Sequence, residues 1–206
     1  MLKGYHTRKI GKRNPLRIIV IVCEGRKTEP MYFNRYRQRN SGLKIETLNS
    51  GDTDPKSLVE FALRQVNRYD LDLESGDQVW CVFDVDHNNE ESLMEAKRIA
   101  GNQVNIALSN PCFELWYLLH FHYSDAPHST GDVIRELKSH IQTYDKTKDC
   151  FDLLLTKRTS AIKNANLLKK KHIQKGIELI SLKSNPSTQV CDLVDYILDV
   201  INKNKP

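Results

Sequence analysis

The 206-residue chain lacks the features that mark membrane and exported proteins. No apolar run reaches the length of about 18 residues that a bilayer-spanning helix needs. The first residues, MLKGYHTRKIGKR, contain no apolar segment of the kind found in secretory signals. Internal repeats and low-complexity linkers are missing as well. The sequence therefore predicts a cytoplasmic protein with no membrane span.

Paired cysteines are also missing. The five cysteines are widely spaced, odd in number and free of any CxxC pair. Such spacing argues against a disulfide framework and against a structural zinc site. The chain is long enough to bury a core without either kind of cross-link.

Acidic residues are absent from two segments, although the chain as a whole carries a net charge of only +5. Residues 1–23 contain six basic side chains and no acid, and residues 157–177 contain seven and no acid. Phosphate contacts by clustered lysine and arginine supply much of the affinity for nucleic acid. A solvated helix face and a basic arm would have the same composition, so both interpretations stay open.

Strand and helix patterns alternate four times in the first part of the chain. Apolar strands are predicted at residues 17–23, 43–48, 79–84 and 104–108, and helices begin near Thr28, Asp54, Glu90 and Pro111. Short connections and right-handed crossovers make a mostly parallel four-stranded sheet flanked by helices the expected α/β fold. We expect one domain at residues 14–123. Residues 124–206 are predicted to form a helical portion packed on it, with helices near residues 132–141, 160–175 and 189–202.

Carboxylates follow the apolar segments at the points where the predicted strands end. Glu24 follows the first strand, and Asp84 and Asp86 end the third. Glu114 stands in an apolar helix after the fourth strand, where a buried carboxylate needs a dipole, a cation or a metal. Ligand sites of parallel sheets lie at this carboxyl edge. Asp, His and Asn also cap turns, so a purely structural role remains the alternative.

The acids favour a hard cation. Carboxylate oxygen suits Mg²⁺ or Mn²⁺, and no His/Cys ligand set lies near these acids in the sequence. We expect Glu24, Asp84 and Asp86 to hold the metal, with Glu24 as third ligand or general acid/base. Lys27 is a candidate for stabilising a scissile phosphate, as are its neighbour Arg26 and His87.

Aromatic residues interleave with arginines after Pro30. Tyr32, Phe33 and Tyr36 alternate with Arg35 and Arg37, which could place base-stacking rings beside phosphate contacts. Core packing of the same rings on one helix face is the other interpretation.

Four segments resemble the RloB-like family of bacterial restriction and abortive-infection loci. They are CEGRKTEPMYF, FDVDHN, SNPCFELWYLLHF and NPSTQV, which begin at Cys23, Phe83, Ser109 and Asn185. The resemblance implies a TOPRIM fold, as in topoisomerases, primases and OLD-type nucleases. It implies a Mg²⁺-dependent nuclease of phage defence and, from the genomic company of the family, a partner ATPase.

The resemblance carries the TOPRIM glutamate onto Glu24 and the metal aspartates onto Asp84 and Asp86. Topoisomerase-type sites often have a third acid where this chain has Asn88, which puts a second metal site in doubt unless Glu114 or Glu29 substitutes.

The expected function is therefore metal-dependent hydrolysis of phosphodiester bonds in nucleic acid, either DNA or RNA, with transfer RNA among the possible substrates. Two rivals stay open at this stage. A phosphohydrolase of haloacid-dehalogenase type would use Asp84 as nucleophile and would not need Glu24. A non-catalytic TOPRIM-like module would bind nucleic acid without turnover.

Overall fold

The computed structural model describes residues 16–39, 41–85 and 88–204. Most of the basic arm, as well as Asp86 and His87, lies outside these ranges. The elements follow one another as β1 Arg17–Cys23, α1 Thr28–Asn34, β2 Leu43–Asn49, α2 Pro55–Arg68, β3 Gln78–Asp84, α3 Glu90–Ala100, β4 Val104–Asn110, α4 Glu114–Leu118, α5 Thr130–His140, α6 Phe151–Leu155, α7 Arg158–Gln174, a 3₁₀ turn Leu182–Ser184, β5 Ser187–Thr188 and α8 Val190–Lys203.

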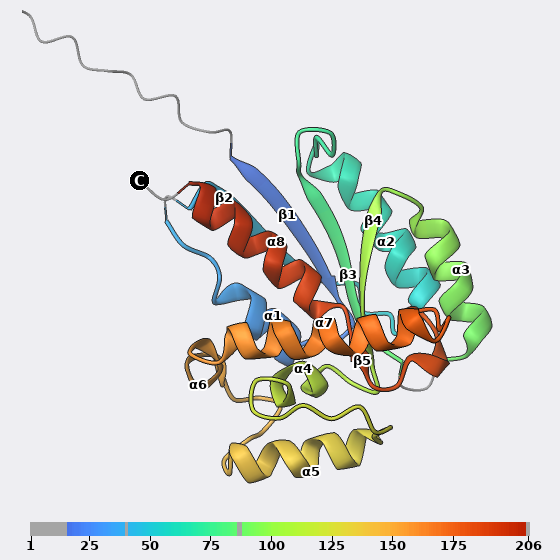
Figure 1. The fold of residues 1–206 in the computed structure, drawn as a ribbon. Coiled ribbons are helices and arrows are strands. Elements are labelled where there is room, and N and C mark those ends of the chain that lie inside the picture. Colours follow the sequence, from blue (N-terminus) through green and yellow to red (C-terminus); the bar gives the residue numbers. More distant parts are fainter. Residues whose placement is uncertain (1–15, 40, 86–87, 205–206) are drawn as a thin grey trace, which may run out of the picture.

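The strands form one sheet in the order β2-β1-β3-β4-β5 (Figure 1). The first four strands are parallel, which confirms the α/β fold class and the predicted edge position of β2. The described residues add a fifth strand that the sequence did not predict. β5 pairs antiparallel with the end of β4, through Ser109 with Thr188 and Asn110 with Ser187. Two polar residues carry no apolar pattern, so only the pairing reveals this strand.

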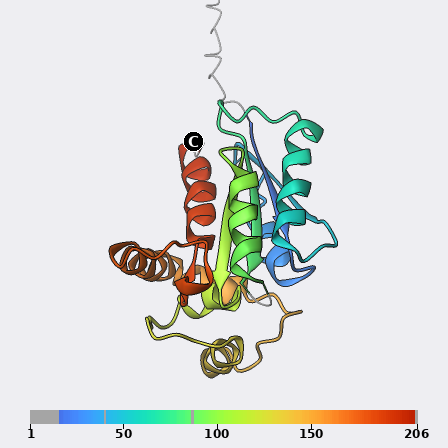
Figure 2. The ribbon, with the colours of Figure 1, turned by 90° about the vertical axis from the view of Figure 1, so that its right-hand side faces the viewer.

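Helices cover both faces of the sheet (Figures 1 and 2). The amphipathic helices α2 and α3 bury residues such as Leu58 and Leu93 against one face. As predicted, α2 begins at an Asp54 cap, whose carboxylate accepts a hydrogen bond from the Ser57 backbone at 2.9 Å. The other face packs against α1, α4, α7 and α8. Both faces are thus buried, as expected for a parallel sheet with continuous apolar strands.

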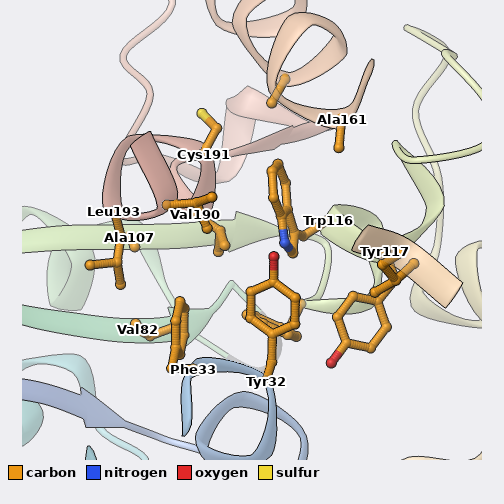
Figure 3. Packing of buried hydrophobic residues seen from close by; sticks show 14 of the residues in the cluster. Tyr32, Phe33, Val82, Ala107, Trp116, Tyr117, Ala161, Val190, Cys191 and Leu193 are labelled. Carbon is orange, nitrogen blue, oxygen red and sulfur yellow. The ribbon is translucent and has the colours of Figure 1, made fainter. Parts of the chain in front are cut away.

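The aromatic residues of α1 and of the turn after it belong to the core. Tyr32, Phe33 and Tyr36 are each 2% exposed or less, and Tyr32 and Phe33 point toward Trp116 and the sheet in Figure 3. The proposed base-stacking role is therefore wrong for these rings, because burial leaves no face open to a base. Helix α1 is also shorter than the sequence suggested and ends at Asn34.

Helix α8 lies on the sheet as predicted, and its stripe of apolar residues is buried. Val190, Leu193, Val194 and Ile197 are fully shielded from solvent. Figure 3 places Val190 and Leu193 of this helix close to Val82 and Ala107 of the sheet.

The lysines of α7 do not form a uniform free surface. Lys169 pairs with Asp192 of α8, and its side chain is only 13% exposed. Lys171 pairs with Asp125. Lys170 is exposed. Of these three lysines, two therefore already have carboxylate partners. Lys170 pairs with no carboxylate among the described residues and stays a candidate for phosphate contact.

Helix α4 begins later than the Asn110-Pro111 start predicted from the sequence. Strand β4 runs on to Asn110, whose amide side chain donates to the carbonyl oxygens of Ser181 and Leu182 at 3.2 and 3.1 Å. Helix α4 begins at Glu114, with Phe113 at its N-cap. Within the described ranges, no helix combines the length and apolar content needed to cross a bilayer.

Candidate functional site

The ends of β1 and β3 bring Glu24 and Asp84 together. The Glu24 backbone N–H donates to the Val82 carbonyl at 3.0 Å, which continues the ladder between the two strands by one residue. The Asp84 backbone N–H in turn donates to Glu24 Oε2 at 3.0 Å. This confirms the predicted convergence of these two acids at the carboxyl edge of the sheet.

The turn after β1 is shaped by an amide and a glycine. Asn49, at the end of β2, donates from Nδ2 to the carbonyl oxygens of Cys23 and Glu24 at 2.9 and 2.7 Å. Next to this turn, the Glu29 carboxylate packs directly on Gly25. A Cβ built at Gly25 would stand 2.1 Å from Glu29 Oε2, so a side chain there would displace that carboxylate.

Glu29 is a buried acid, only 6% exposed, at the start of α1. Loss of solvation raises the pKa of Glu29 to about 7, and the neighbouring Glu114 and Glu24 carboxylates add to the rise. The pKa of Asp84 is likewise raised well above its usual range, first by burial and then by Glu29, Glu114 and Glu24. The carboxylates of the site therefore repel one another when no metal cation is bound.

Glu114 completes the group of acids and is 1% exposed. Its Oε1 atom accepts a hydrogen bond from the Tyr144 hydroxyl at 2.9 Å and pairs with the Lys146 ammonium at 3.3 Å. Partial burial opposes the charged form of Lys146, but Glu114 outweighs this effect, and the pKa of Lys146 is raised. The sequence indicated that this buried carboxylate needs a helix dipole, a cation or a metal. Among the described residues, Lys146 is that cation.

These acids line a cavity of about 440 Å³, which we call the acid pocket. Its wall is formed by the turn after β1, the start of α1, the end of β3, the start of α4 and one residue of the loop before α6. The lining residues are Glu24, Gly25, Arg26, Lys27, Thr28, Glu29, Thr53, Asp84, Phe113, Glu114 and Lys146. The predicted residues Glu24, Asp84, Glu114 and Lys27 therefore share one cavity, while Asp86 lies outside the described chain.

The donor set of the acid pocket suits a hard cation. The Asp84 Oδ1 atom is buried and has no hydrogen-bond partner among the described residues, which leaves a costly bare acceptor that a cation would satisfy. Even so, no three His, Cys, Asp or Glu side chains among the described residues form a ready ligand group. Asp84 and Glu24 are the residues placed to hold a metal, and further oxygens would have to come from Asp86, water or a phosphate.

Asn88, at the place of a third acid, has a structural role. Its Nδ2 donates to the Asp84 carbonyl at 2.9 Å, and its backbone N–H donates to the Val85 carbonyl at 2.9 Å. These bonds fix the chain as it leaves β3.

Two cations stand at the rim of the acid pocket. Arg26 and Lys27 are exposed, and neither forms an ion pair with another described residue. They are available to an anionic ligand that enters the cavity.

Sequence reasoning missed Tyr144, Lys146 and Thr53. The first two lie in a polar loop, YDKTKD, with no apolar period and no motif. Only the folding of this loop against α1 and α4 brings it to the acids. The need of Glu114 for a partner was the one available signal, and it did not say which cation would serve.

Comparison with known protein families identifies the chain. The family model described as RloB-like protein matches residues 19–197. The chain belongs to the RloB-like family. Comparisons with curated proteins and with solved structures found no match. In this RloB-like chain, the matched range contains every residue of the acid pocket.

Proposed function

We propose that this RloB-like protein is a Mg²⁺-dependent nuclease of the TOPRIM type, which hydrolyses phosphodiester bonds in nucleic acid. The observation that carries the proposal is the Glu24–Asp84 pair at the carboxyl edge of two adjacent parallel strands, where the buried Asp84 Oδ1 has no partner within the described part of the chain. An acid after β1 and another at the end of β3, within a run of four parallel strands, support the TOPRIM assignment.

Asp84 and Glu24 would hold Mg²⁺ or Mn²⁺, with Asp86 as the further proposed ligand. When bound, the metal would supply Lewis-acid polarisation of the scissile phosphate. With Asn88 engaged in backbone hydrogen bonds, we propose a single metal rather than a pair.

The other residues of the acid pocket would handle charge and protons. Lys27 and Arg26 at the rim would bind the phosphate by charge-assisted contacts. Glu29, with a pKa of about 7, can hold a proton at neutral pH inside the cavity. A group of this kind is suited to give a proton to a leaving oxygen. Glu114 would pair with Lys146 and accept the hydrogen bond of the Tyr144 hydroxyl.

The family resemblance also suggests a substrate, a biological setting and a partner. The substrate would be DNA or RNA, including transfer RNA, and the setting would be bacterial phage defence in the cytoplasm with a partner ATPase. The basic segment at residues 157–177 supports a polyanionic substrate, although two of its lysines are paired with carboxylates.

The test is incubation of the purified protein with plasmid, single-stranded DNA and total RNA in Mg²⁺, Mn²⁺ or EDTA. We expect cleavage that needs the metal and disappears in Asp84→Asn, which keeps the shape but loses the charge. Asp70→Asn is the matched control, because Asp70 is exposed in the loop before β3, away from the carboxyl edge, and its φ of 50° suits asparagine.

Glu24→Gln should also abolish cleavage, with a smaller loss of metal binding. Full Mg²⁺-dependent cleavage by Asp84→Asn would refute the site. A phosphoaspartate trapped on Asp84 would favour the haloacid-dehalogenase alternative. Nucleic-acid binding that is indifferent to EDTA, without turnover, would favour the non-catalytic one.

A further inference from the structure

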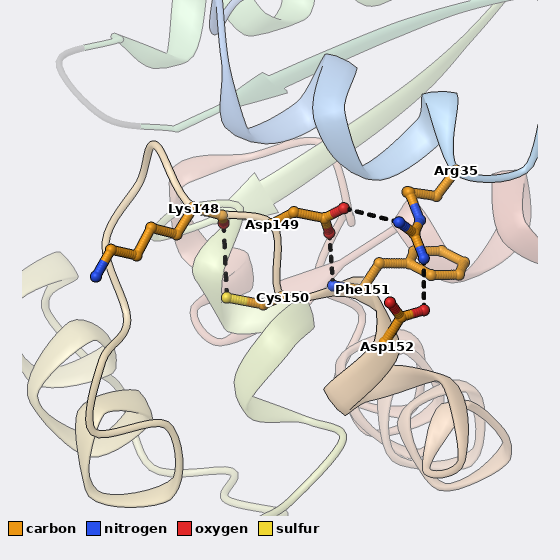
Figure 4. A network of polar contacts seen from close by, with 6 residues as sticks. All are labelled: Arg35, Lys148, Asp149, Cys150, Phe151 and Asp152. Atoms are coloured by element: carbon orange, nitrogen blue, oxygen red, sulfur yellow. Dashed lines mark hydrogen bonds and ion pairs between the residues drawn. The ribbon is translucent and has the colours of Figure 1, made fainter.

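A loop from the C-terminal portion closes one side of the acid pocket. Residues 141–150, which we call the strap, connect α5 to α6 and run past α1 and α4. The Thr28 hydroxyl donates to the Lys146 carbonyl at 3.0 Å. At the far end of the strap, Arg35, just after α1, pairs with Asp149 and with Asp152, the latter just inside α6 (Figure 4). The strap is thus held at Lys146 itself and again after it.

These contacts place the Lys146 ammonium beside the acids of the pocket. The Lys146 Nζ atom stands 3.3 Å from Glu114 Oε1, and the Tyr144 hydroxyl donates to the same oxygen. The Glu114 side chain is 2% exposed, whereas that of Lys146 is 57% exposed. The ammonium therefore reaches the buried carboxylate from the solvent side and has open space into which it can withdraw.

Two other acids of the pocket have no such partner. Glu29 and Asp84 form no ion pair with any residue in the described ranges, and the Glu29 carboxylate helps to raise the pKa of Asp84. A divalent cation would relieve this repulsion more than one ammonium can. It would also compete with the ammonium for Glu114, because two cations at one buried carboxylate repel each other.

We propose that Lys146 is a built-in counter-ion of the acid pocket, which neutralises Glu114 in the metal-free protein and is displaced when a divalent cation binds. The inference rests on the proposed function, since it concerns the loading of the same site. The strap thereby sets the metal affinity: each binding event must release the ammonium from Glu114. Because the Lys146 side chain is 57% exposed, its ammonium can leave Glu114 for solvent and return.

The experiment is calorimetric titration of Mn²⁺ and Mg²⁺ into the metal-stripped full chain at pH 8. Lys146→Met should bind Mn²⁺ about two- to fivefold more tightly than the parent, because metal binding no longer has to break the ion pair between Lys146 and Glu114. Lys146→Arg, which keeps the charge, should bind as the parent does. Lys148→Met is the matched control, because Lys148 is exposed in the same strap and its side chain points away from the Arg35 network in Figure 4.

A second measurement needs no variant. Acetylation of the parent, followed by mass spectrometry, should find Lys146 more reactive with Mn²⁺ than with EDTA, while Lys148 stays unchanged. Metal affinity that is equal or weaker in Lys146→Met, or reactivity of Lys146 that ignores Mn²⁺, would overturn the counter-ion role and leave the proposed function standing. Failure of the parent itself to bind either metal would overturn the proposed function and the counter-ion role with it.

Discussion

The buried acid Glu29 makes the stability of the metal-free protein depend on pH in an unusual direction. Its pKa is raised from 4.5 to about 7 in the folded chain. Between these values the folded state keeps a proton that the unfolded state has lost. The free energy of unfolding therefore falls as the pH rises from about 4.5 to about 7, and the full cost is present above that window.

The size of the effect follows from the same two values. A tenfold change in an acid constant corresponds to about 1.4 kcal/mol, so the rise to about 7 corresponds to roughly 3 kcal/mol. Glu29→Gln cannot ionise and is nearly isosteric. At pH 8 in EDTA, this variant should be more stable than the parent by roughly 3 kcal/mol, or about 6 to 12 °C in melting temperature for a chain of this length.

Thermal unfolding of parent and variant from pH 4.5 to 8 measures this difference directly. The gap should close as the pH approaches 4.5, because Glu29 is then protonated in both states. Glu74→Gln is the control, since Glu74 is exposed in the loop before β3, and it should give no pH-dependent gap. A Glu29→Gln advantage of the same size at pH 5 and pH 8 would refute the burial argument.

Three further outcomes are expected. Ile197→Ala should lower the free energy of unfolding in denaturant by roughly 2 to 5 kcal/mol, because Ile197 is fully buried. An unfolding midpoint equal to the parent's would contradict the packing of α8 in the core. Lys170→Gln should lower the log-log salt slope of nucleic-acid binding by about 1, whereas Lys169→Gln should leave the slope unchanged and lower the melting temperature through loss of its Asp192 partner. Gly25→Ala should push the Glu29 carboxylate from its place on Gly25 and so shrink the parent's gain in stability at acid pH; an undiminished gain would contradict the packing.

Continuous apolar strands and helix caps made much of the fold predictable. Strand β1 has the bounds expected from its apolar run, and α3 begins at Glu90 as predicted. Strand β5 was not predictable, because its two residues are identified by pairing with β4 and not by hydrophobicity. The start of α4 was also missed, because β4 runs on to Asn110 and the helix begins at Glu114 rather than near Pro111.

The acid pocket, too, was predictable only in part. Glu24 and Asp84 could be placed together because parallel strands bring their carboxyl ends to one edge. The partners of Glu114 could not, because Tyr144 and Lys146 reach it through the folding of a loop that has no pattern of its own. Tyr32 was open to two interpretations, base stacking beside the arginines or core packing, and its burial confirms core packing.

The position of α8 has a consequence for the synthesis of the protein. Residues of β1 and β3, made early, share their hydrophobic cluster with Val190, Leu193 and Ile197, which leave the ribosome much later. Until then one face of the nascent sheet stays bare and is a ready target for chaperones and for sticking to other chains. A premature stop before residue 190 should therefore yield an aggregating fragment rather than a smaller folded protein.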